Sequence, residues 1–342
     1  MTLPAALRQQ AMNNESLGSP FTARVLRLLA DRLWPDTALT RRLFDWPGDI
    51  GPGAASVPLR LLGGLQALVL QGDAPDLIAC YPPNLPCDDD RLWRAIDTAM
   101  REQAEFLDTW LNSPPQTNEV RRAAVMIAAG HWLADHYGLP MTLSELGASG
   151  GLNLMWDQYA LSVNGQTFGP SEAAFTLSPD WSGAMPPPTP PLVADRRGVD
   201  LNPLDPHDPR DALRLTAYLW ADQPDRLART RAAIAVARAP VDKGDAAAWL
   251  AKRLASPLPG HLHLVYHTIA WQYFPPDTQQ ACLDSLFAAG QAATHDAPLA
   301  RLSMEADGGK GAAITLWLWP EGQKISLGRV DFHGRWLDWR AG

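Results

Sequence analysis

The residues best suited to chemistry are five small ones in a row, Gly147-Ala148-Ser149-Gly150-Gly151. Small residues between a strand and a helix occur in two kinds of site. One is the G-x-S-x-G turn that presents a serine nucleophile, and the other is the glycine-rich turn that lets the backbone approach a nucleotide cofactor. The first kind predicts a hydrolase, and the second predicts a cofactor-dependent enzyme.

A serine hydrolase places a histidine and an acidic residue beside its nucleophile. The order Ser149, Asp245, His267 matches that of enzymes with this turn. Such an enzyme also needs a second backbone donor from an earlier strand-to-helix loop. Residues 1–140 show no strand pattern, so no such loop is predicted. We therefore keep the serine hydrolase as an alternative interpretation.

A cofactor site places an acidic residue at the end of the first strand, glycines after it, and a second acidic residue at the end of the next core strand. The pattern Glu145-x-Gly147-x-Ser149-x-Gly151 supplies the first part, and Asp200 in GVDLNP supplies the second. A carboxylate at that position can accept hydrogen bonds from ribose hydroxyls. We expect the amides after the first strand to be free for the ligand.

Four segments in order resemble the motif series of class I S-adenosylmethionine-dependent methyltransferases. They are Glu145-Leu-Gly-Ala-Ser-Gly-Gly, GVDLNP, Gly244-Asp245-Ala246 and LVYHTIAWQYFPP, and the likeness covers residues 140–340. The resemblance implies S-adenosylmethionine as cofactor. It implies that the first motif holds the methionine and ribose parts, Asp200 the ribose, and Asp245 with Ala246 the adenine. Ser149 departs from the family pattern, where glycine is usual.

The whole chain also resembles a bacterial family of uncharacterised proteins. Segments that carry this likeness include QTNEVRRAA, ELGASGGLNLMWDQY, RRGVDLNPLDP and HTIAWQYFPP. The resemblance implies a helical N-terminal half and a methyltransferase-like C-terminal half, and it implies no particular activity.

Candidate catalytic residues follow from the fourth motif, which the methyltransferase resemblance places beside the reacting methyl group. His267 is the acid–base candidate because the ordinary pKa of histidine lies near neutrality. Trp271 and Tyr273 are candidates for an aromatic cage, since π faces attract onium cations. The alternatives are a buried structural histidine and aromatic residues of the core.

The start of the helix predicted over 118–137 supplies the candidates for acceptor binding. Gln116, Asn118 and Glu119 form a polar cluster there; Gln116 and Asn118 are candidates for substrate binding, and Glu119 is a further catalytic candidate. An all-helical half before a cofactor-binding sheet often covers the crevice, which would bring this cluster to the methyl acceptor. A glutamate in the first helical turn is also favourable without any function.

Two regions with different patterns must position these residues. Apolar positions three and four apart predict helices over 57–71, 88–111 and 118–137, and no strand before residue 141. After residue 141, strands alternate with helices, and Asn164-Gly165 predicts a hairpin. We expect an α/β protein with a helical cap (1–140) and a doubly wound, mostly parallel Rossmann-like sheet ending in an antiparallel strand (141–342).

Composition narrows the function classes. The net charge of −8, without a run of Lys and Arg, argues against nucleic acid as partner. Three cysteines without C-x-x-C spacing predict no zinc site, and the absence of a signal peptide or long apolar run predicts a cytoplasmic protein away from membranes. We expect methyl transfer to a small molecule or protein group; a non-catalytic interaction protein on the same scaffold is a further alternative.

Overall fold

The computed structural model describes residues 1–84 and 86–341 and divides the chain into two compact units. The helical unit consists of Met1–Thr117 and His207–Arg231, and the sheet unit consists of Asn118–Pro206 and Ala232–Gly342. This division differs from the boundary at residue 140. Residues 118–140 group with the sheet, and residues 207–231, which the sequence placed in the second domain, group with the N-terminal helices.

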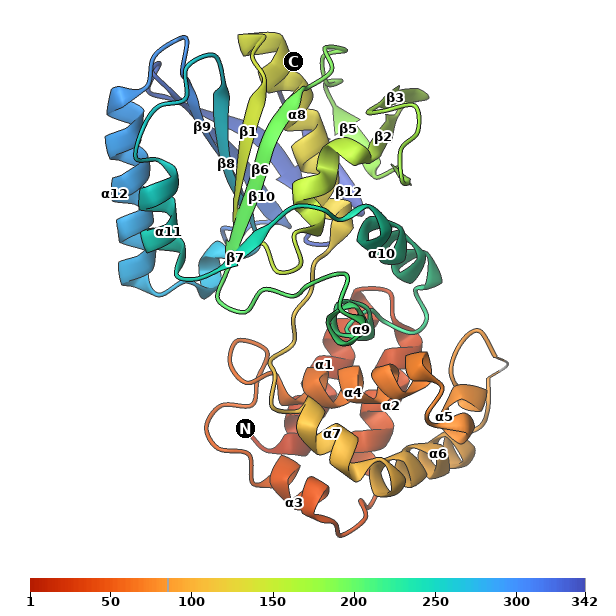
Figure 1. Cartoon of the computed structure of the whole chain (residues 1–342). Coiled ribbons are helices and arrows are strands. Elements are labelled where there is room, and N and C mark those ends of the chain that lie inside the picture. The colour runs from red at the N-terminus through yellow and green to blue at the C-terminus, as the bar shows by residue number, and fades with distance from the viewer. Residues whose placement is uncertain (85, 342) are drawn as a thin grey trace. The chain divides into compact units, whose positions relative to one another are not determined.

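The helical unit contains no strand among its described residues (Figure 1). Its helices are α1 (Leu3–Ser16), α2 (Pro20–Asp31), α3 (Ala38–Phe44), α4 (Val57–Gln71), α5 (Pro75–Cys80), α6 (Asp89–Glu102), α7 (Ala104–Trp110), α9 (Pro209–Ala217) and the first part of α10 (Pro224–Val236). The Asp222 carboxylate accepts hydrogen bonds from the Phe21 amide, at 2.8 Å, and from the Ser19 hydroxyl. These bonds fix the inserted segment to the start of α2.

The sheet unit contains a nine-stranded sheet in the order β5-β12-β11-β10-β9-β8-β1-β6-β7. Its strands are β1 (Met141–Leu146), β5 (Asp180–Gly183), β6 (Val193–Asp200), β7 (Val241–Lys243), β8 (Leu262–Thr268), β9 (Leu299–Ala306), β10 (Ala312–Trp319), β11 (Gln323–Val330) and β12 (Trp336–Trp339). The five neighbouring strands β7, β6, β1, β8 and β9 are parallel to one another. In contrast, β10, β11 and β12 each pair antiparallel with the strand before them in the chain. The expected Rossmann-like fold class is confirmed.

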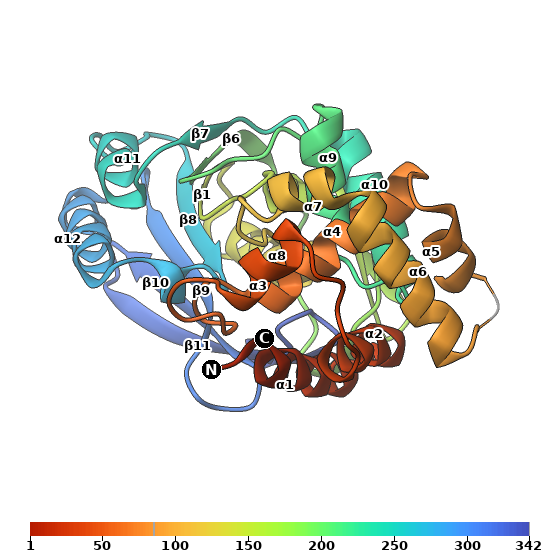
Figure 2. The same ribbon diagram turned by 90° about the horizontal axis from the view of Figure 1, so that it is seen from below.

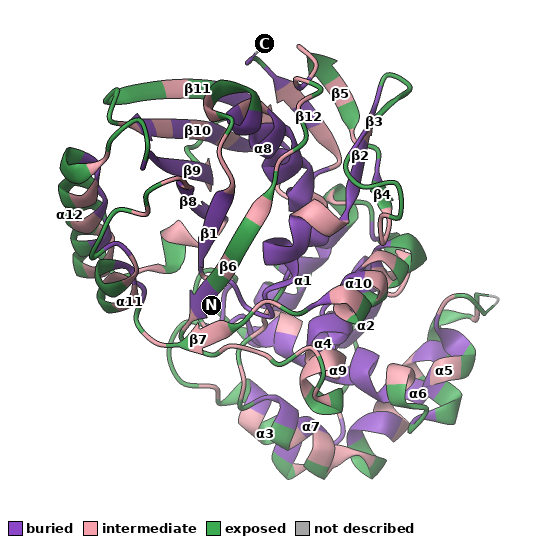
Figure 3. Ribbon diagram, turned by 45° about the horizontal axis from the view of Figure 1, so that its top comes forward, coloured by how far each residue is buried: buried purple, intermediate pink, exposed green. Residues whose placement is uncertain are grey.

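Helices cover both faces of this sheet (Figures 1 and 2). Side chains of α11 (Ala246–Arg253) and α12 (Pro276–Ala292) pack on one face with Leu146 and Val265. Side chains of α8 (Ala123–Tyr137) and the short 3-10 helix η2 (Leu152–Gln158) pack on the other face with Leu143 and Tyr266. Every residue of β1 is buried, whereas much of β6 is exposed (Figure 3).

The Asn164-Gly165 hairpin is confirmed. Both residues have positive φ, 49° and 82°, and they join β2 (Ala160–Val163) to β3 (Gln166–Phe168). The sequence missed β4 (Thr176–Leu177) and β5, which lie in the polar, proline-rich segment, and the short strand β7. The residues after Gly151, where helical spacing and the alternation of strands with helices predict a helix, form only the 3-10 helix η2. Among the described residues, no helix combines the length and apolar character needed to cross a membrane.

Candidate functional site

The candidate site lies where the carboxyl ends of β1 and β6 meet. The parallel strands follow the order β7-β6-β1-β8-β9, so the connections reverse direction between β1 and β8. Ligands of open α/β sheets bind outside the carboxyl ends of strands at this kind of point. Glu145 pairs in register with Gly198, and side chains alternate along a strand, so Glu145 and Asp200 point to the same face.

Glu145 is a buried carboxyl group with an unpartnered oxygen. The residue is 2% exposed, and its Oε2 atom has no hydrogen-bond partner. Burial raises the pKa of Glu145 well above its ordinary value, the charge of Asp200 raises it further, and Arg122 opposes the rise. Burial therefore favours the neutral form of this side chain, and a cationic ligand would favour its ionised form.

Four of the five amides in the glycine-rich loop, all but that of Gly150, are used in hydrogen bonds, so the expectation that the loop amides are free is wrong for these four. Gly147 and Ala148 both donate to the carbonyl oxygen of Val199, at 2.9 and 3.1 Å. The Ser149 amide donates to Asp200 Oδ2, at 2.9 Å. The Gly151 amide donates to the carbonyl oxygen of Ala148, at 2.8 Å. Because these donors are used within the protein, the loop offers no open cradle for a phosphate group.

Several buried acceptor atoms of β1, the loop and η2 have no hydrogen-bond partner among the described residues. Ser149 Oγ and Asn153 Oδ1 are buried without a partner, as is Glu145 Oε2. Asp200 accepts two amide hydrogens, from Ser149 and Asn202, and each carboxylate oxygen keeps a lone pair. Buried polar atoms without partners are uncommon in folded proteins, and a group of them marks a place where a ligand or water binds. Asn153 Oδ1 can only accept, and the Ser149 hydroxyl and the Glu145 carboxyl can also accept, so these groups suit a ligand that donates hydrogen bonds.

Two candidates from the polar cluster before α8 lie beside this loop. Asn118 Oδ1 accepts the Leu152 amide, at 2.9 Å, and the Glu119 carbonyl oxygen accepts from the Asn153 side chain, at 3.3 Å. Asn118 and Glu119 are buried, at 6% and 2% exposed, so in this structure they support the loop. Gln116, the third candidate, belongs to the helical unit.

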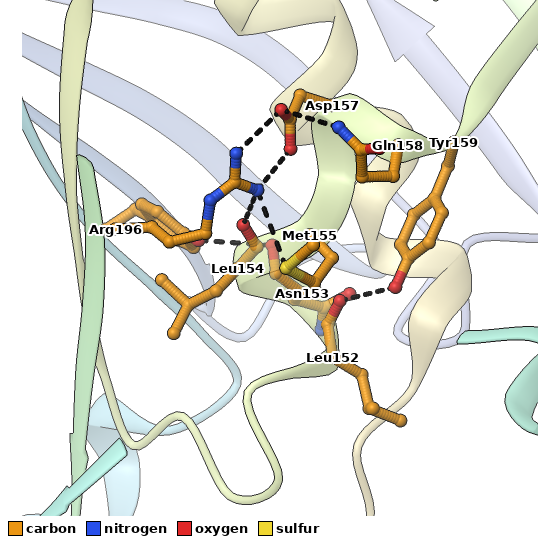
Figure 4. Close-up of polar contacts among 9 residues, drawn as sticks. Leu152, Asn153, Leu154, Met155, Asp157, Gln158, Tyr159 and Arg196 are labelled. Atoms are coloured by element: carbon orange, nitrogen blue, oxygen red, sulfur yellow. Dashed lines mark hydrogen bonds and ion pairs between the residues drawn. The ribbon is translucent and has the colours of Figure 1, made fainter. Parts of the chain in front are cut away.

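A buried ion pair holds the segment that follows the loop (Figure 4). The Arg196 guanidinium on β6 bonds both carboxylate oxygens of Asp157, at 2.5 and 2.8 Å, and also the carbonyl oxygen of Leu154, at 2.9 Å. The Tyr159 hydroxyl donates to the carbonyl oxygen of Leu152, at 2.6 Å. These contacts fix η2 against the sheet and thereby place Asn153 near the loop.

His267 points to the opposite face of the sheet from Glu145. Glu145 pairs in register with Tyr266, so the next residue along β8 faces α12. His267 is 1% exposed; its Nδ1 contacts Glu305 Oε1 at 2.7 Å, and its Nε2 accepts from Arg301 at 3.0 Å. Burial lowers the pKa of His267, and Glu305 opposes the change. Both ring nitrogens are occupied, so this histidine fixes local structure.

The two aromatic candidates do not form a cage. Trp271 stacks on the His267 ring, with centroids 4.7 Å apart, and the Arg301 guanidinium lies 4.5 Å from its ring centre. Tyr273 is 67% exposed. Because His267 and Arg301 contact the Trp271 ring, its faces are not open to a ligand cation.

Asp245 begins α11. Its Oδ1 accepts the amides of Ala247 and Ala248, at 3.0 and 3.1 Å, as an N-cap residue does. Ala246, the first residue of α11, is buried. The structure thus gives Asp245 a structural role that does not depend on a cofactor, although its exposed side chain still lies at the carboxyl end of β7.

The hydrogen bonds of a serine hydrolase triad do not occur among the described residues. Ser149 has the positive φ, 53°, of a strained turn, but its hydroxyl is buried without a partner. His267 bonds Glu305 and Arg301 instead, and Asp245 caps a helix. Ser149 therefore has no base in contact with it.

The sequence of the whole chain matches the model of one protein family. The family model described as "Uncharacterized protein conserved in bacteria (DUF2332)" matches residues 4–339. The chain belongs to this family. The match confirms the expected likeness to an uncharacterised bacterial family and covers both compact units. It provides no homology to methyltransferases, and a search of curated proteins found no match.

Several residues that build the site in this family member were missed from the sequence. Arg196, Asn153 and Tyr159 support the loop, and Glu305 and Arg301 hold the segment after β8. Glu305 also accepts the amides of Ala270 and Trp271, both at 3.1 Å. A charged residue at alternate positions of an apolar strand, as in LARLSME, was the available signal.

Replacing Gly147 by alanine is expected to lower the free energy of unfolding by about 2–4 kcal/mol. Gly147 has φ of 71°, and an added Cβ would lie 2.7 Å from the Ala270 Cβ. A matched control is Gly165→Ala, since Gly165 also has positive φ, 82°, but nothing lies within 4 Å of an added Cβ. Urea unfolding should show a clearly smaller loss for the control, and Ala270→Gly should partly restore the first variant. Equal losses would contradict the packing explanation.

Proposed function

We propose that the carboxyl ends of β1 and β6 bind S-adenosylmethionine and that this family member transfers its methyl group to a small molecule or a protein group. The observation that carries the proposal is the buried, unpartnered Glu145 carboxyl group next to Asp200. The ordered motifs and the reversal between β1 and β8 support the same reading.

The open groups fit this cofactor. Its methionine part carries an ammonium group, which Glu145 would neutralise as a buried ion pair. Its ribose carries two hydroxyls, which Asp200 would accept. Ser149 Oγ and Asn153 Oδ1 are buried acceptors available for the remaining donors. When bound, the cofactor supplies a methyl group already activated on a sulfonium.

The arrangement disfavours cofactors that depend on a phosphate group. Those ligands use free amides and a helix N-terminus, and here the loop amides bind Val199, Asp200 and Ala148. A phosphate would also lie near the acidic pair of Glu145 and Asp200. We therefore expect nicotinamide dinucleotides to bind at least about tenfold more weakly than S-adenosylmethionine, which corresponds to 1.4 kcal/mol.

The methyl acceptor needs no strong base on the protein when its nucleophilic atom carries a free lone pair. In that case, alignment of the acceptor with the methyl carbon supplies most of the rate. His267 is not proposed as the base because both its ring nitrogens are bonded and it faces α12. The net charge of −8 favours a small molecule or a protein over nucleic acid.

Isothermal titration of the full chain with S-adenosylmethionine and with its demethylated product tests the proposal. We expect saturable binding of both, with Kd below about 100 µM. No heat with either ligand, for protein that unfolds cooperatively, would overturn it and favour the non-catalytic interaction protein. Labelling of Ser149 by a fluorophosphonate would instead favour the hydrolase.

The affinity for S-adenosylmethionine is expected to rise with pH. Burial raises the pKa of Glu145 in the free protein, and the ligand ammonium favours the carboxylate, so binding releases a proton. Below the raised pKa, Kd should fall by up to about tenfold per pH unit, and this fall should end where Glu145 is ionised or the ligand ammonium begins to lose its proton. Titrations from about pH 5.5 to 8.5 measure this. 5′-Methylthioadenosine lacks the ammonium group, so the same slope with that ligand would contradict the role of Glu145.

A further inference from the structure

Two arginines in the helical unit have no acidic partner among the described residues. Arg60 on α4 is 9% exposed and donates only to backbone carbonyl oxygens, those of Ala55 and Leu111, at 2.7 and 2.8 Å. Arg214 on α9 is half-buried, and its buried Nη1 atom has no hydrogen-bond partner among the described residues. Its guanidinium lies 4.5 Å from the ring centre of Trp110. Buried cations of this kind are costly unless an anion neutralises them.

Two neutral donors lie with these arginines. Trp110 Nε1 on α7 and the Tyr218 hydroxyl, directly after α9, are both buried, and neither has a hydrogen-bond partner outside this cluster among the described residues. Their rings are 5.8 Å apart. Burial raises the pKa of Tyr218, whereas the positive charge of Arg214, a hydrogen bond from Trp110 and the positive charge of Arg60 oppose the rise. An indole N–H can only donate, and so can a guanidinium.

Helix α4 is adapted to bring these groups together. An added Cβ on Gly63 would lie 2.4 Å from the Tyr218 ring, and one on Gly64 would lie 2.7 Å from the Leu107 side chain and 3.2 Å from the Trp110 ring. Glycine is among the least favourable residues inside a helix, so two in succession need a packing reason. Here they allow Tyr218 and Trp110 to approach the helix backbone. Figure 1 shows α9 beside α4 within this unit.

We propose that Arg60, Trp110, Arg214 and Tyr218 form a binding site for one small oxyanion group, a carboxylate or a phosphate. The site is independent of the proposed cofactor site, because every residue belongs to the helical unit. The four side chains supply donors and two positive charges, which complement an oxyanion.

Thermal unfolding of the full chain in increasing sodium phosphate or sodium acetate, at constant ionic strength, tests this site. We expect a saturable rise of the melting temperature with at least one of the two anions, since a ligand that binds only the folded state stabilises it. A response to phosphate alone assigns a phosphoryl group, and a response to both assigns any small oxyanion. No saturable response to either would overturn the proposal.

Three variants make the test specific. Arg214→Gln should abolish the response, and Tyr218→Phe, which keeps the ring, should weaken the anion affinity by at least about fivefold. The control Arg8→Gln removes the same charge from the exposed Arg8–Asp31 pair of this unit and should respond as the unaltered protein does. An unchanged response in Arg214→Gln would overturn the site. If Arg214→Gln lowers the melting temperature, relative to the unaltered protein, by the same amount in anion-free buffer and in saturating anion, Arg214 has a purely structural role and the site is overturned.

Discussion

Replacing Glu145 by glutamine is expected to weaken the binding of S-adenosylmethionine by at least about 100-fold. The substitution keeps the shape of the side chain but removes the negative charge that would neutralise the ligand ammonium. Isothermal titration measures the loss. The matched control is Glu172→Gln, since Glu172 is an exposed carboxylate of the same unit. Binding by Glu145→Gln with unchanged affinity would contradict the proposed site.

The same variant should also change how stability depends on pH. The folded-state pKa of Glu145 is raised, so the folded protein binds more protons than the unfolded chain between the two pKa values. The stability that this group contributes is complete below the unfolded pKa and is lost as pH rises through the folded pKa. The free energy of unfolding of Glu145→Gln, relative to the unaltered protein, should therefore rise by up to about 1.4 kcal/mol per pH unit in that window. If urea unfolding gives the same difference in free energy between the two proteins at every pH, the raised pKa of the buried Glu145 is contradicted.

Replacing Arg196 by methionine is expected to lower the free energy of unfolding by about 3–5 kcal/mol. The side chains of Arg196 and Asp157 are only 19% and 14% exposed, so loss of the arginine leaves a buried carboxylate without a counter-charge. It also removes the bond to Leu154 that fixes η2 (Figure 4). Chemical denaturation measures the change, and the double variant Arg196→Met with Asp157→Leu should recover most of it.

The neighbouring residue provides a close control for this prediction. Arg197 pairs with Asp242 through two hydrogen bonds, at 2.6 and 2.8 Å, but these side chains are 46% and 34% exposed. Exposed ion pairs contribute at most about 1 kcal/mol. Arg197→Met should therefore cost much less than Arg196→Met. Equal losses would mean that burial does not determine the effect.

Features that depend on neighbouring residues in the chain were predictable from the sequence. Helix α4 spans residues 57–71 as predicted, and it ends at Gly72, whose φ of 89° few other residues adopt. Asn164 and Gly165 adopt the left-handed conformations that a tight hairpin requires. Charged and polar residues at the ends of β1 and β6 were also found, because parallel strands bring their carboxyl ends to one edge.

Features that depend on packing between residues far apart in the chain were not predictable from the sequence. The segment after Gly151 has helical spacing, but it forms the 3-10 helix η2, where Trp156 is buried against Gly130 of α8 and Arg196 bonds its backbone. Such contacts outweigh intrinsic helix preference, which is weak for each residue. The loop amides similarly bond Val199 and Asp200, residues that only the parallel pairing of β1 and β6 brings close.

The sequence by itself determined which kinds of element form, in what order, and which carboxylates stand at strand ends, because these follow from local periodicity and turn chemistry. Only the tertiary structure decided that Glu145 and His267 lie on opposite faces, since that depends on the register between β1 and β8. The tertiary structure alone also decided that residues 207–231 join the N-terminal helices, where Arg214 and Tyr218 contact Trp110. Contacts between residues so far apart in the chain leave no local pattern.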